Sequence, residues 1–402
     1  MRRVTKATSA RGTWRKRSSG TGLARACTAI LVVLVAAFGL VAPVDARTAI
    51  DCPLRDQAYS LDSPLMDLML KPEARAAIER ETPALLPGLP PMLLSTEAPA
   101  FSAIMTLRTL GSMRGSAAEE LQRIDRALNA LPVTDADRAA RCARYDTDRP
   151  PLAIAKGKPR LLLFEKMTGF RDGPSVEAAN AALRDMATRN GWALVVSDKG
   201  GAITPSILRE FDAVIWNNVS GDVLTLTQRR AFEDYIANGG GYVGIHGSGG
   251  DPVYFWDWYV DTLIGARFAG HPMDPQFQDA RVLFESGASA IGHELASGVT
   301  MNDEWYSFRN NPRKGGAIVI ATLDESSYSP VGHGGQDLRM GDHPIAWTRC
   351  IGDGRSFYSA IGHRPEIYSD AHHVKLLEQA IAWAAGTGKT QCKAGREVER
   401  SG

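Results

Sequence analysis

The chain contains, near its middle, the segment Gly239-Gly-Gly-Tyr-Val-Gly-Ile-His-Gly-Ser-Gly249. Its apolar part, residues 242–245, has the uninterrupted hydrophobic pattern of a buried parallel strand. The glycines that follow permit a tight strand-to-helix turn, in which a ligand can approach backbone N–H groups closely. The Gly-x-His-x-Ser pattern has the form of a nucleophile elbow with the imidazole of His246 at its apex. The segment predicts an α/β sheet with a histidine at the carboxyl end of one strand.

Similar apolar runs lie on both sides of this segment. They cover residues 161–164, 193–196 and 213–216 before it, and 317–320, 345–347 and 356–359 after it. Amphipathic helical stretches separate the early runs, and the helix before residue 239 starts at a capping box formed by Thr225 and Gln228. A last helix is expected over residues 371–385. Strands and helices in alternation predict a doubly wound, mostly parallel α/β sheet, flavodoxin-like in type.

The residues before this α/β domain have a different hydrophobic pattern. Residues 53–145 carry short apolar-periodic stretches cut by prolines, with no histidine and no tryptophan, and they predict a small helical module without catalytic groups. Residues 146–158 read as a linker. The α/β domain is expected over residues 159–386, and residues 387–402 form a C-terminal tail.

The charge of the chain is unevenly distributed. Its 402 residues include 46 Lys and Arg against 45 Asp and Glu, and a hydrophobic fraction of 44% excludes a disordered chain. Residues 1–46 hold eight of the basic side chains and one acid, followed within this stretch by an uncharged apolar run of 15 residues at 28–42. This pattern predicts an export signal cleaved near Ala46, with an uncleaved anchor as the alternative. We expect a secreted or periplasmic protein.

Removal of residues 1–46 leaves a net charge of −6. Neither nucleic acid nor a membrane surface is then an expected partner, because both attract basic patches. Four cysteines remain, at positions 52, 142, 350 and 392, and an even number suits an oxidising compartment. Of the three possible connectivities we favour Cys52–Cys142 and Cys350–Cys392, because each pair falls within or beside one candidate domain. Four unpaired thiols are the alternative.

The candidate functional residues gather in the α/β part, where all eight histidines lie. His246 and His363 each follow an apolar strand, where ligands bind in open α/β sheets. Glu366 stands three residues after His363 and could orient its ring. The run Asp303-Glu-Trp-Tyr306 places two acids against two aromatic side chains, which suits a sugar, although a turn with a buried tryptophan gives the same pattern. His343, before a proline and a strand, is either a ligand contact or a turn residue.

Taken together, residues 159–386 resemble the ThuA-like (trehalose-utilisation) family, whose fold is that of class I glutamine amidotransferases. The matching stretches, in family order, are Thr168-Gly-Phe-Arg171, Asn217, Ser220-Gly-Asp222, Gly239 to His246, Tyr259, Phe268-Ala-Gly-His-Pro272, Asp303-Glu-Trp-Tyr306, Thr322-Leu-Asp-Glu325, Asp342-His-Pro-Ile-Ala-Trp347, Gly354-Arg-Ser-Phe-Tyr358 and Gly362-His363.

The resemblance implies a site at the elbow. In the amidotransferases the apex carries a catalytic cysteine, and a late strand is followed by a His and Glu pair. Here His246 holds the apex, and His363 and Glu366 resemble the late pair. Without a thiol at the apex, glutamine hydrolysis through a thioester is excluded. Family members often have histidine after Gly-Phe-Arg, where this chain has Asp172.

The leading hypothesis is an exported carbohydrate-active hydrolase or lyase that acts on a sugar or keto-sugar glycoside by acid–base chemistry. We assign catalytic roles to His246, His363, Glu366, Glu304 and His343, and substrate contacts to Phe170, Arg171, Asn217, His271, Asp303, Trp305 and Tyr306. A small-molecule carbohydrate is the expected partner. We predict no cofactor and no metal. A metal held by the imidazoles of residues 246, 271, 343 and 363 is a third possibility, although no ligand spacing supports it. A non-catalytic carbohydrate-binding or scaffold protein with the same pocket is the alternative.

Overall fold

The structure is a computed structural model that describes residues 50–285, 291–292, 295, 297–387 and 392. The export signal expected at residues 1–46 lies outside this part of the chain, as does most of the C-terminal tail. Among the described residues, no helix is both long enough and apolar enough to cross a bilayer.

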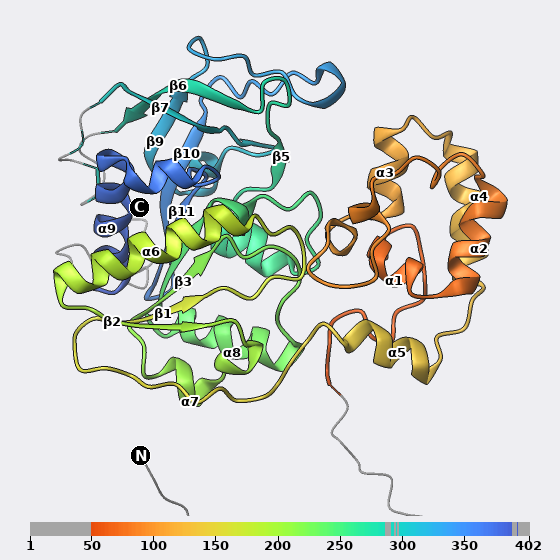
Figure 1. The fold of residues 1–402 in the computed structure, drawn as a ribbon, viewed down its shortest axis with the longest axis horizontal. Helices are drawn as coiled ribbons and strands as arrows, with labels where there is room; N and C mark the ends of the chain where they lie inside the picture. Colours follow the sequence, from red (N-terminus) through yellow and green to blue (C-terminus); the bar gives the residue numbers. More distant parts are fainter. Residues whose placement is uncertain (1–49, 286–290, 293–294, 296, 388–391, 393–402) are drawn as a thin grey trace, which may run out of the picture. The chain divides into compact units, whose positions relative to one another are not determined.

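Nine strands of the described residues form one sheet in the order β2-β1-β3-β4-β11-β10-β9-β6-β7 (Figure 1). The first five strands in this order run parallel, and each of the remaining four runs antiparallel to its neighbours. The parallel strands are β1 (Arg160–Phe164), β2 (Ala193–Ser197), β3 (Ala213–Asn217), β4 (Gly241–Ile245) and β11 (Gly354–Ser359), and the others are β6 (Phe277–Phe284), β7 (Val299–Glu304), β9 (Ile318–Asp324) and β10 (Pro344–Ile351). The mostly parallel sheet of the sequence analysis is confirmed.

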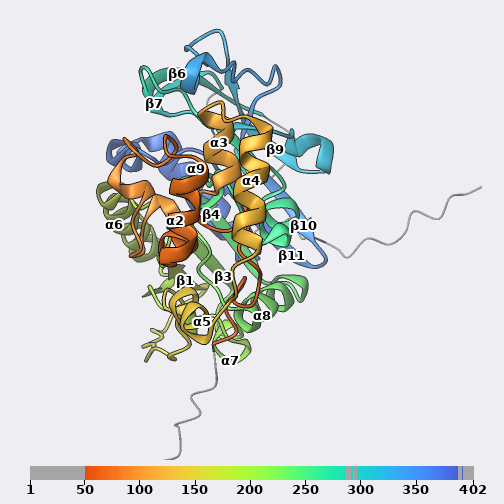
Figure 2. The same ribbon diagram turned by 90° about the vertical axis from the view of Figure 1, so that its right-hand side faces the viewer.

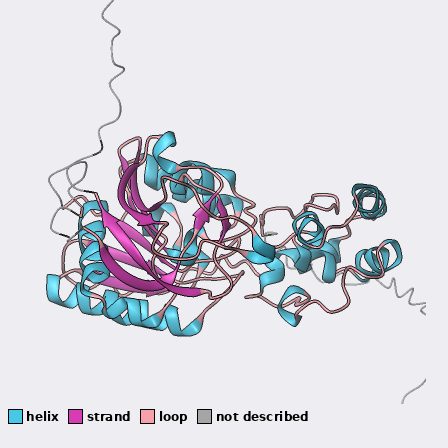
Figure 3. Cartoon of the chain, turned by 90° about the horizontal axis from the view of Figure 1, so that it is seen from above, coloured by secondary structure: helices cyan, strands magenta, loops and turns pink. Residues whose placement is uncertain are grey.

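Helices cover both faces of this sheet (Figures 1 and 3). They are α6 (Gly173–Asn190), α7 (Pro205–Leu208), α8 (Leu226–Ala237) and α9 (Ala371–Ala384). Because β2 lies on one side of β1 and β3 and β4 lie on the other, right-handed crossovers place α6 on one face and α7 and α8 on the opposite face. The capping box of Thr225 and Gln228 is present at the start of α8. The doubly wound architecture is therefore confirmed.

Four strands lie where the sequence analysis placed none. These are β6, β7 and the two strands of a small separate sheet, β5 (Phe268–Gly270) and β8 (Ser307–Phe308). Strand β6 alternates exposed and buried positions because its sheet face is only partly covered, so its sequence lacks the continuous apolar run of a parallel strand. This antiparallel edge carries Asp303 and Glu304 at the end of β7.

The helical module at the start of the described chain contains α1 (Leu65–Met69), α2 (Pro72–Glu81), α3 (Leu107–Met113), α4 (Ala118–Asn129) and α5 (Asp135–Cys142). Helices α2 and α4 pack together (Figure 2) around a core that includes Leu68, Ile78 and Leu128. The backbone N–H of Ala100 donates to the carbonyl of Thr168 at 3.1 Å, which ties the module to the loop after β1.

Both favoured cysteine pairs are confirmed as disulfides, Cys52–Cys142 and Cys350–Cys392. The first joins the beginning of the described chain to the end of α5, and the second joins β10 to Cys392. Disulfides persist in oxidising compartments, so the two bridges are compatible with a secreted or periplasmic protein.

One histidine lies in the core of the α/β domain, on helix α9. His373 on α9 is fully buried, and neither ring nitrogen has a hydrogen-bond partner among the described residues. Its ring packs edge-on against Tyr368. Burial lowers the pKa of His373 to about 4; the neighbouring Asp370 acts in the opposite direction, and His246 lowers it further.

This burial predicts acid sensitivity. In the unfolded chain His373 binds a proton below about pH 6.5, whereas in the folded protein it binds one only near pH 4, so the free energy of unfolding falls as the pH falls between these values. Between pH 7 and pH 4.5, we expect the free energy of unfolding of the wild type to fall by about 2 kcal/mol more than that of His373→Leu. Urea unfolding at the two pH values measures this difference. Equal losses in the two proteins would show that His373 does not cause the sensitivity.

Candidate active site

His246 lies at the end of β4, at the apex of the predicted tight turn. Its φ of +40° falls in the left-handed region, and His246 is the first residue of a 3₁₀ helix, His246–Gly249. A side chain at Gly249 would come within 2.5 Å of the Tyr358 ring, which explains the glycine there. The Tyr358 hydroxyl donates to the carbonyl of His246 at 2.8 Å. The elbow therefore aims one imidazole at the carboxyl edge of the sheet.

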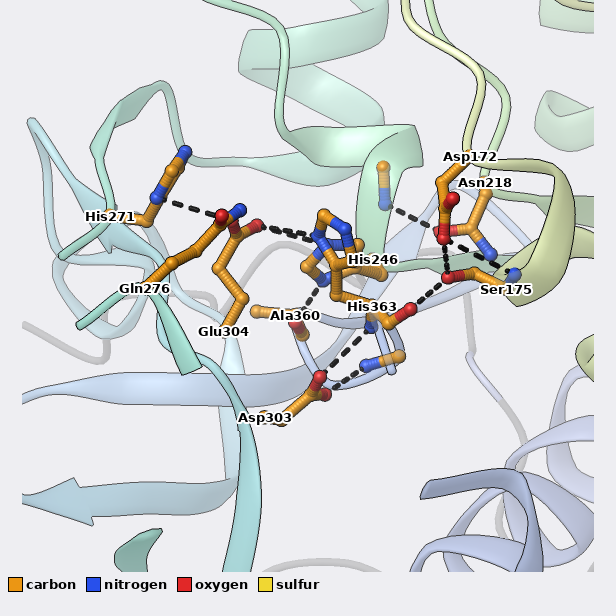
Figure 4. A network of polar contacts seen from close by, with 12 residues as sticks. Asp172, Ser175, Asn218, His246, His271, Gln276, Asp303, Glu304, Ala360 and His363 are labelled. Atoms are coloured by element: carbon orange, nitrogen blue, oxygen red, sulfur yellow. Dashed lines mark hydrogen bonds and ion pairs between the residues drawn. The ribbon is translucent and has the colours of Figure 1, made fainter. Parts of the chain in front are cut away.

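Three side chains meet at this edge, each from a different part of the chain (Figure 4). Nε2 of His246 lies 3.2 Å from Nδ1 of His363 and 3.3 Å from Oε2 of Glu304. Nδ1 of His363 lies 3.0 Å from the same Glu304 oxygen. His363 follows β11 and Glu304 ends β7, so strands far apart in the sheet supply the cluster. We call His246, His363 and Glu304 the site cluster.

The surroundings of the site cluster orient each of its members. Nδ1 of His246 donates to the carbonyl of Ala360 at 2.7 Å, because a carbonyl can only accept. The other Glu304 oxygen, Oε1, lies 3.2 Å from Nδ1 of His271 and accepts from the side-chain amide of Gln276. The Tyr306 ring stacks on the His246 ring with centroids 4.2 Å apart. The three cluster atoms are thus held facing one another.

Burial and charge act in opposite directions on the cluster. Burial favours the neutral form of Glu304, yet hydrogen bonds from His246 and His363 outweigh it and hold the pKa of Glu304 well below its ordinary value. Burial also disfavours the charged form of His363, but the contact with Glu304 outweighs this and raises the pKa of His363. The site therefore holds a buried carboxylate that is stabilised by positive charge beside it.

Asp303 supports the loop that carries His363. Its carboxylate is fully buried and accepts backbone N–H groups of Gly362 at 2.6 Å, His363 at 3.1 Å and Arg364 at 2.9 Å. Burial raises the pKa of Asp303, while the charge of His246 and the N–H groups of Arg364 and Gly362 act in the opposite direction. Asp303 thus fixes the backbone under the imidazole.

A cavity of about 590 Å³ opens beside His363. Its lining includes Asp172, Phe277, Asn302, Arg364 and Glu366. The rings of Phe277 and Phe170 lie 5.1 Å and 6.2 Å from the His363 ring, and both side chains are 39% exposed. Accessible aromatic surface therefore flanks the one cluster member that lines this cavity.

Comparison with known proteins then decides the family. Residues 160–384 match the family model of ThuA, described as trehalose utilisation. The chain belongs to the ThuA family. This membership links it to carbohydrate metabolism connected with trehalose utilisation.

Among solved structures, this ThuA-family chain is similar to a putative ThuA-like protein from Bacteroides uniformis, with 24% sequence identity and a TM-score of 0.50. The match covers 60% of this chain and 97% of that one. It is also similar to a putative ThuA-like protein from Parabacteroides merdae at 16% identity, with a TM-score of 0.41, over 60% and 93% of the two chains. The first of these likenesses supports the fold. None of the curated proteins compared matches the sequence.

The remaining predicted catalytic residues of this ThuA-family protein lie outside the site cluster. Glu366 is exposed and pairs with Arg364 at 3.2 Å, and in the described chain it makes no hydrogen bond to either cluster imidazole. Glu304 takes the place next to His363 that we had assigned to Glu366. His343 is buried, bonds Glu325 at 2.8 Å through Nδ1, and donates from Nε2 to the Tyr306 carbonyl at 2.9 Å. It supports the ring that stacks on His246.

The predicted substrate contacts of the ThuA-family site divide into two groups. Phe170 and Arg171 are exposed on the first loop, and His271 is half-buried against Glu304. Asn217 and Trp305 are buried instead. Asn217 donates to Glu165 at 2.7 Å and to the Val176 carbonyl, while the Trp305 indole N–H donates to the Gln278 carbonyl at 2.8 Å. Because Trp305 lies in the core, its ring does not offer a surface to a ligand.

Sequence reasoning did not single out Phe277 or Gln276, which lie at the start of β6 and just before it. Both belong to the antiparallel edge that had no strand signal, so nothing in the local pattern pointed to them. Asp172, which stands where family members often have histidine, caps α6 through the Ser175 N–H at 3.3 Å and lines the cavity. That departure therefore places a carboxylate beside His363.

Among the described residues, His246, Glu304 and His363 are the group whose ligand atoms, all within 4.8 Å of one another, can hold a metal ion. Only two of the four imidazoles considered in the sequence analysis belong to it. His271 contacts the far oxygen of Glu304, and His343 bonds Glu325.

Proposed function

We propose that this protein is an exported enzyme that acts on a sugar or keto-sugar glycoside related to trehalose, with the site cluster as its reactive centre. The observation that carries this proposal is the contact of His246 with His363 and Glu304, where His363 lines a cavity together with the accessible ring of Phe277. The two disulfides support export, with the cleavage expected near Ala46.

The lining of the cavity suits a carbohydrate. The apolar face of a sugar ring stacks on aromatic side chains, and Phe170 and Phe277 offer such surfaces next to His363. Sugar hydroxyls bind carboxylates, amides and guanidinium groups, which Asp172, Asn302 and Arg364 supply around the same cavity. A volume of about 590 Å³ is within the range of small-molecule sites.

The site cluster supplies the chemistry. Two imidazoles and a carboxylate in mutual contact can accept a proton from a substrate hydroxyl or from the carbon next to a keto group, and return it to the leaving oxygen. An amidotransferase reaction is not proposed, because its nucleophile would have to be a thiol and His246 holds the apex. The contact between His246 and His363 supports catalysis over binding alone.

The proposal is tested by incubating the purified protein with disaccharides and their 3-keto derivatives and following products by mass spectrometry. We expect the wild type to form product, and His363→Ala and His246→Asn each to reduce turnover at least about a hundredfold, the scale of a lost acid–base group. Asparagine is chosen at position 246 because it tolerates a positive φ.

The matched control is His333→Ala, which removes an exposed imidazole from a 3₁₀ turn outside the site. Circular dichroism verifies that each variant is folded. Saccharide binding without product in the wild type would support the binding alternative, and wild-type turnover in either site variant would contradict the assignment of the cluster.

A further inference from the structure

The spacing of the site cluster matches the spacing of ligands around one metal ion. Its three facing atoms are separated by 3.0, 3.2 and 3.3 Å. Two ligands that each lie about 2.1 Å from an ion are about 3.0 Å apart at a right angle and about 3.4 Å apart at the tetrahedral angle. All three separations fall within this interval, so one ion can bind all three atoms.

The hydrogen bond from Nδ1 of His246 leaves Nε2, the ring nitrogen that faces Glu304, available to bind a metal ion. Its Nδ1 carries a hydrogen because it faces the Ala360 carbonyl at 2.7 Å. In the neutral ring Nε2 then has a lone pair, which points toward the Glu304 carboxylate oxygen at 3.3 Å. A positive species must lie between these two atoms at this distance, a proton in the metal-free protein or a metal ion that takes its place.

The groups behind the ligands have the form expected around a metal. Ligating imidazoles commonly donate their second N–H to a carbonyl or carboxylate, and ligating carboxylates are themselves hydrogen-bonded. Ala360 does this for His246. Gln276 does it for Glu304 by donating to Oε1, which leaves Oε2 toward the imidazoles. Asp303 fixes the backbone that carries His363.

We propose that Nε2 of His246, Nδ1 of His363 and Oε2 of Glu304 bind one divalent first-row transition-metal ion. Two imidazoles and one carboxylate suit Zn²⁺, Fe²⁺ and their neighbours better than Ca²⁺ or Mg²⁺, which prefer oxygen ligands alone. Three protein ligands leave positions open for a ligand, as in catalytic metal sites. His363, whose side chain is 14% exposed, lines the cavity at which such a ligand would enter.

The proposed ion would act as a Lewis acid on a hydroxyl or carbonyl oxygen of the sugar. This role rests on the proposed function, whereas metal binding itself rests on the geometry of the cluster alone. This proposal departs from the expectation, drawn from the sequence, that the protein needs no metal.

The test is calorimetric titration of tag-free, chelator-treated protein with Zn²⁺, together with visible absorption after addition of Co²⁺. We expect one equivalent per chain with a Kd below about 1 μM, and intense Co²⁺ bands of a low-symmetry site. Glu304→Gln and His246→Asn should each weaken Zn²⁺ binding at least about a hundredfold. Gln276→Ala should weaken it about tenfold, the scale of a lost outer hydrogen bond to Glu304.

His333→Ala, which removes an exposed histidine, should bind Zn²⁺ like the wild type. Thermal unfolding without metal verifies that the variants are folded. Wild-type protein that binds no Zn²⁺, or binding that survives both Glu304→Gln and His246→Asn, would overturn the metal site. The metal titration contains no sugar, so it tests metal binding separately from turnover. A protein that binds Zn²⁺ but converts no sugar would therefore contradict the proposed function and leave the metal site in place.

Discussion

Replacing Asp303 with alanine is expected to lower the free energy of unfolding by about 3 kcal/mol, because three backbone N–H groups in one loop lose their acceptor. Removal of a buried charge returns part of this cost, since burial alone disfavours the ionised carboxylate. The released loop carries His363, so turnover and Zn²⁺ binding should also fall at least about a hundredfold. Urea unfolding and metal titration measure the two effects.

Asp303→Asn gives a graded comparison. An asparagine keeps one acceptor oxygen but turns its amide N–H₂ toward the remaining donors, so its stability should lie between those of the wild type and the alanine variant. Asp185→Ala, on the exposed face of α6, serves as the control for loss of an acid and should change stability by less than about 0.5 kcal/mol. An Asp303→Ala protein that unfolds like the wild type would show that the loop does not depend on Asp303.

Removing the Cys52–Cys142 bridge with Cys52→Ala and Cys142→Ala together is expected to cost about 4.6 kcal/mol of unfolding free energy. The bridge spans 90 residues, and the chain-entropy relation for a loop of this length gives a cost of that size. The two cysteines and Tyr145 also form a small buried cluster at the end of α5. Urea unfolding of the variant and of the wild type, both without reductant, measures the loss.

Reduction provides the matched comparison for the bridge. A reducing agent should destabilise the wild type more than the double variant, because the variant has only Cys350–Cys392 left to lose. Equal unfolding midpoints for the oxidised wild type and the double variant would contradict the prediction.

The parallel half of the sheet was predictable from local sequence. Strands β1, β3 and β4 are buried on both faces, so each reads as a continuous apolar run, and helices α6 and α8 carry their own N-caps. Strands β6 and β7 were not predictable in this way. They lie at the antiparallel edge, where the half-exposed face admits polar residues and the periodic signal is lost.

The candidate site shows the same division. His246 and His363 could be chosen because each directly follows a buried strand. The choice of Glu366 as the orienting carboxylate rested on its position three residues after His363, yet its side chain pairs with Arg364 at the surface. Glu304, which is 59 residues away from His363, provides the contact instead. Separation along the chain carries no information about such a pair.

Local pattern alone thus determined the strand ends at which the two imidazoles stand, because burial of a strand and the turn after it are encoded by neighbouring residues. The carboxylate that meets those imidazoles was decided by tertiary structure. Glu304 reaches them only because β6, β7, β9 and β10 extend the sheet beyond β11, and strand pairing and register between distant segments set that position.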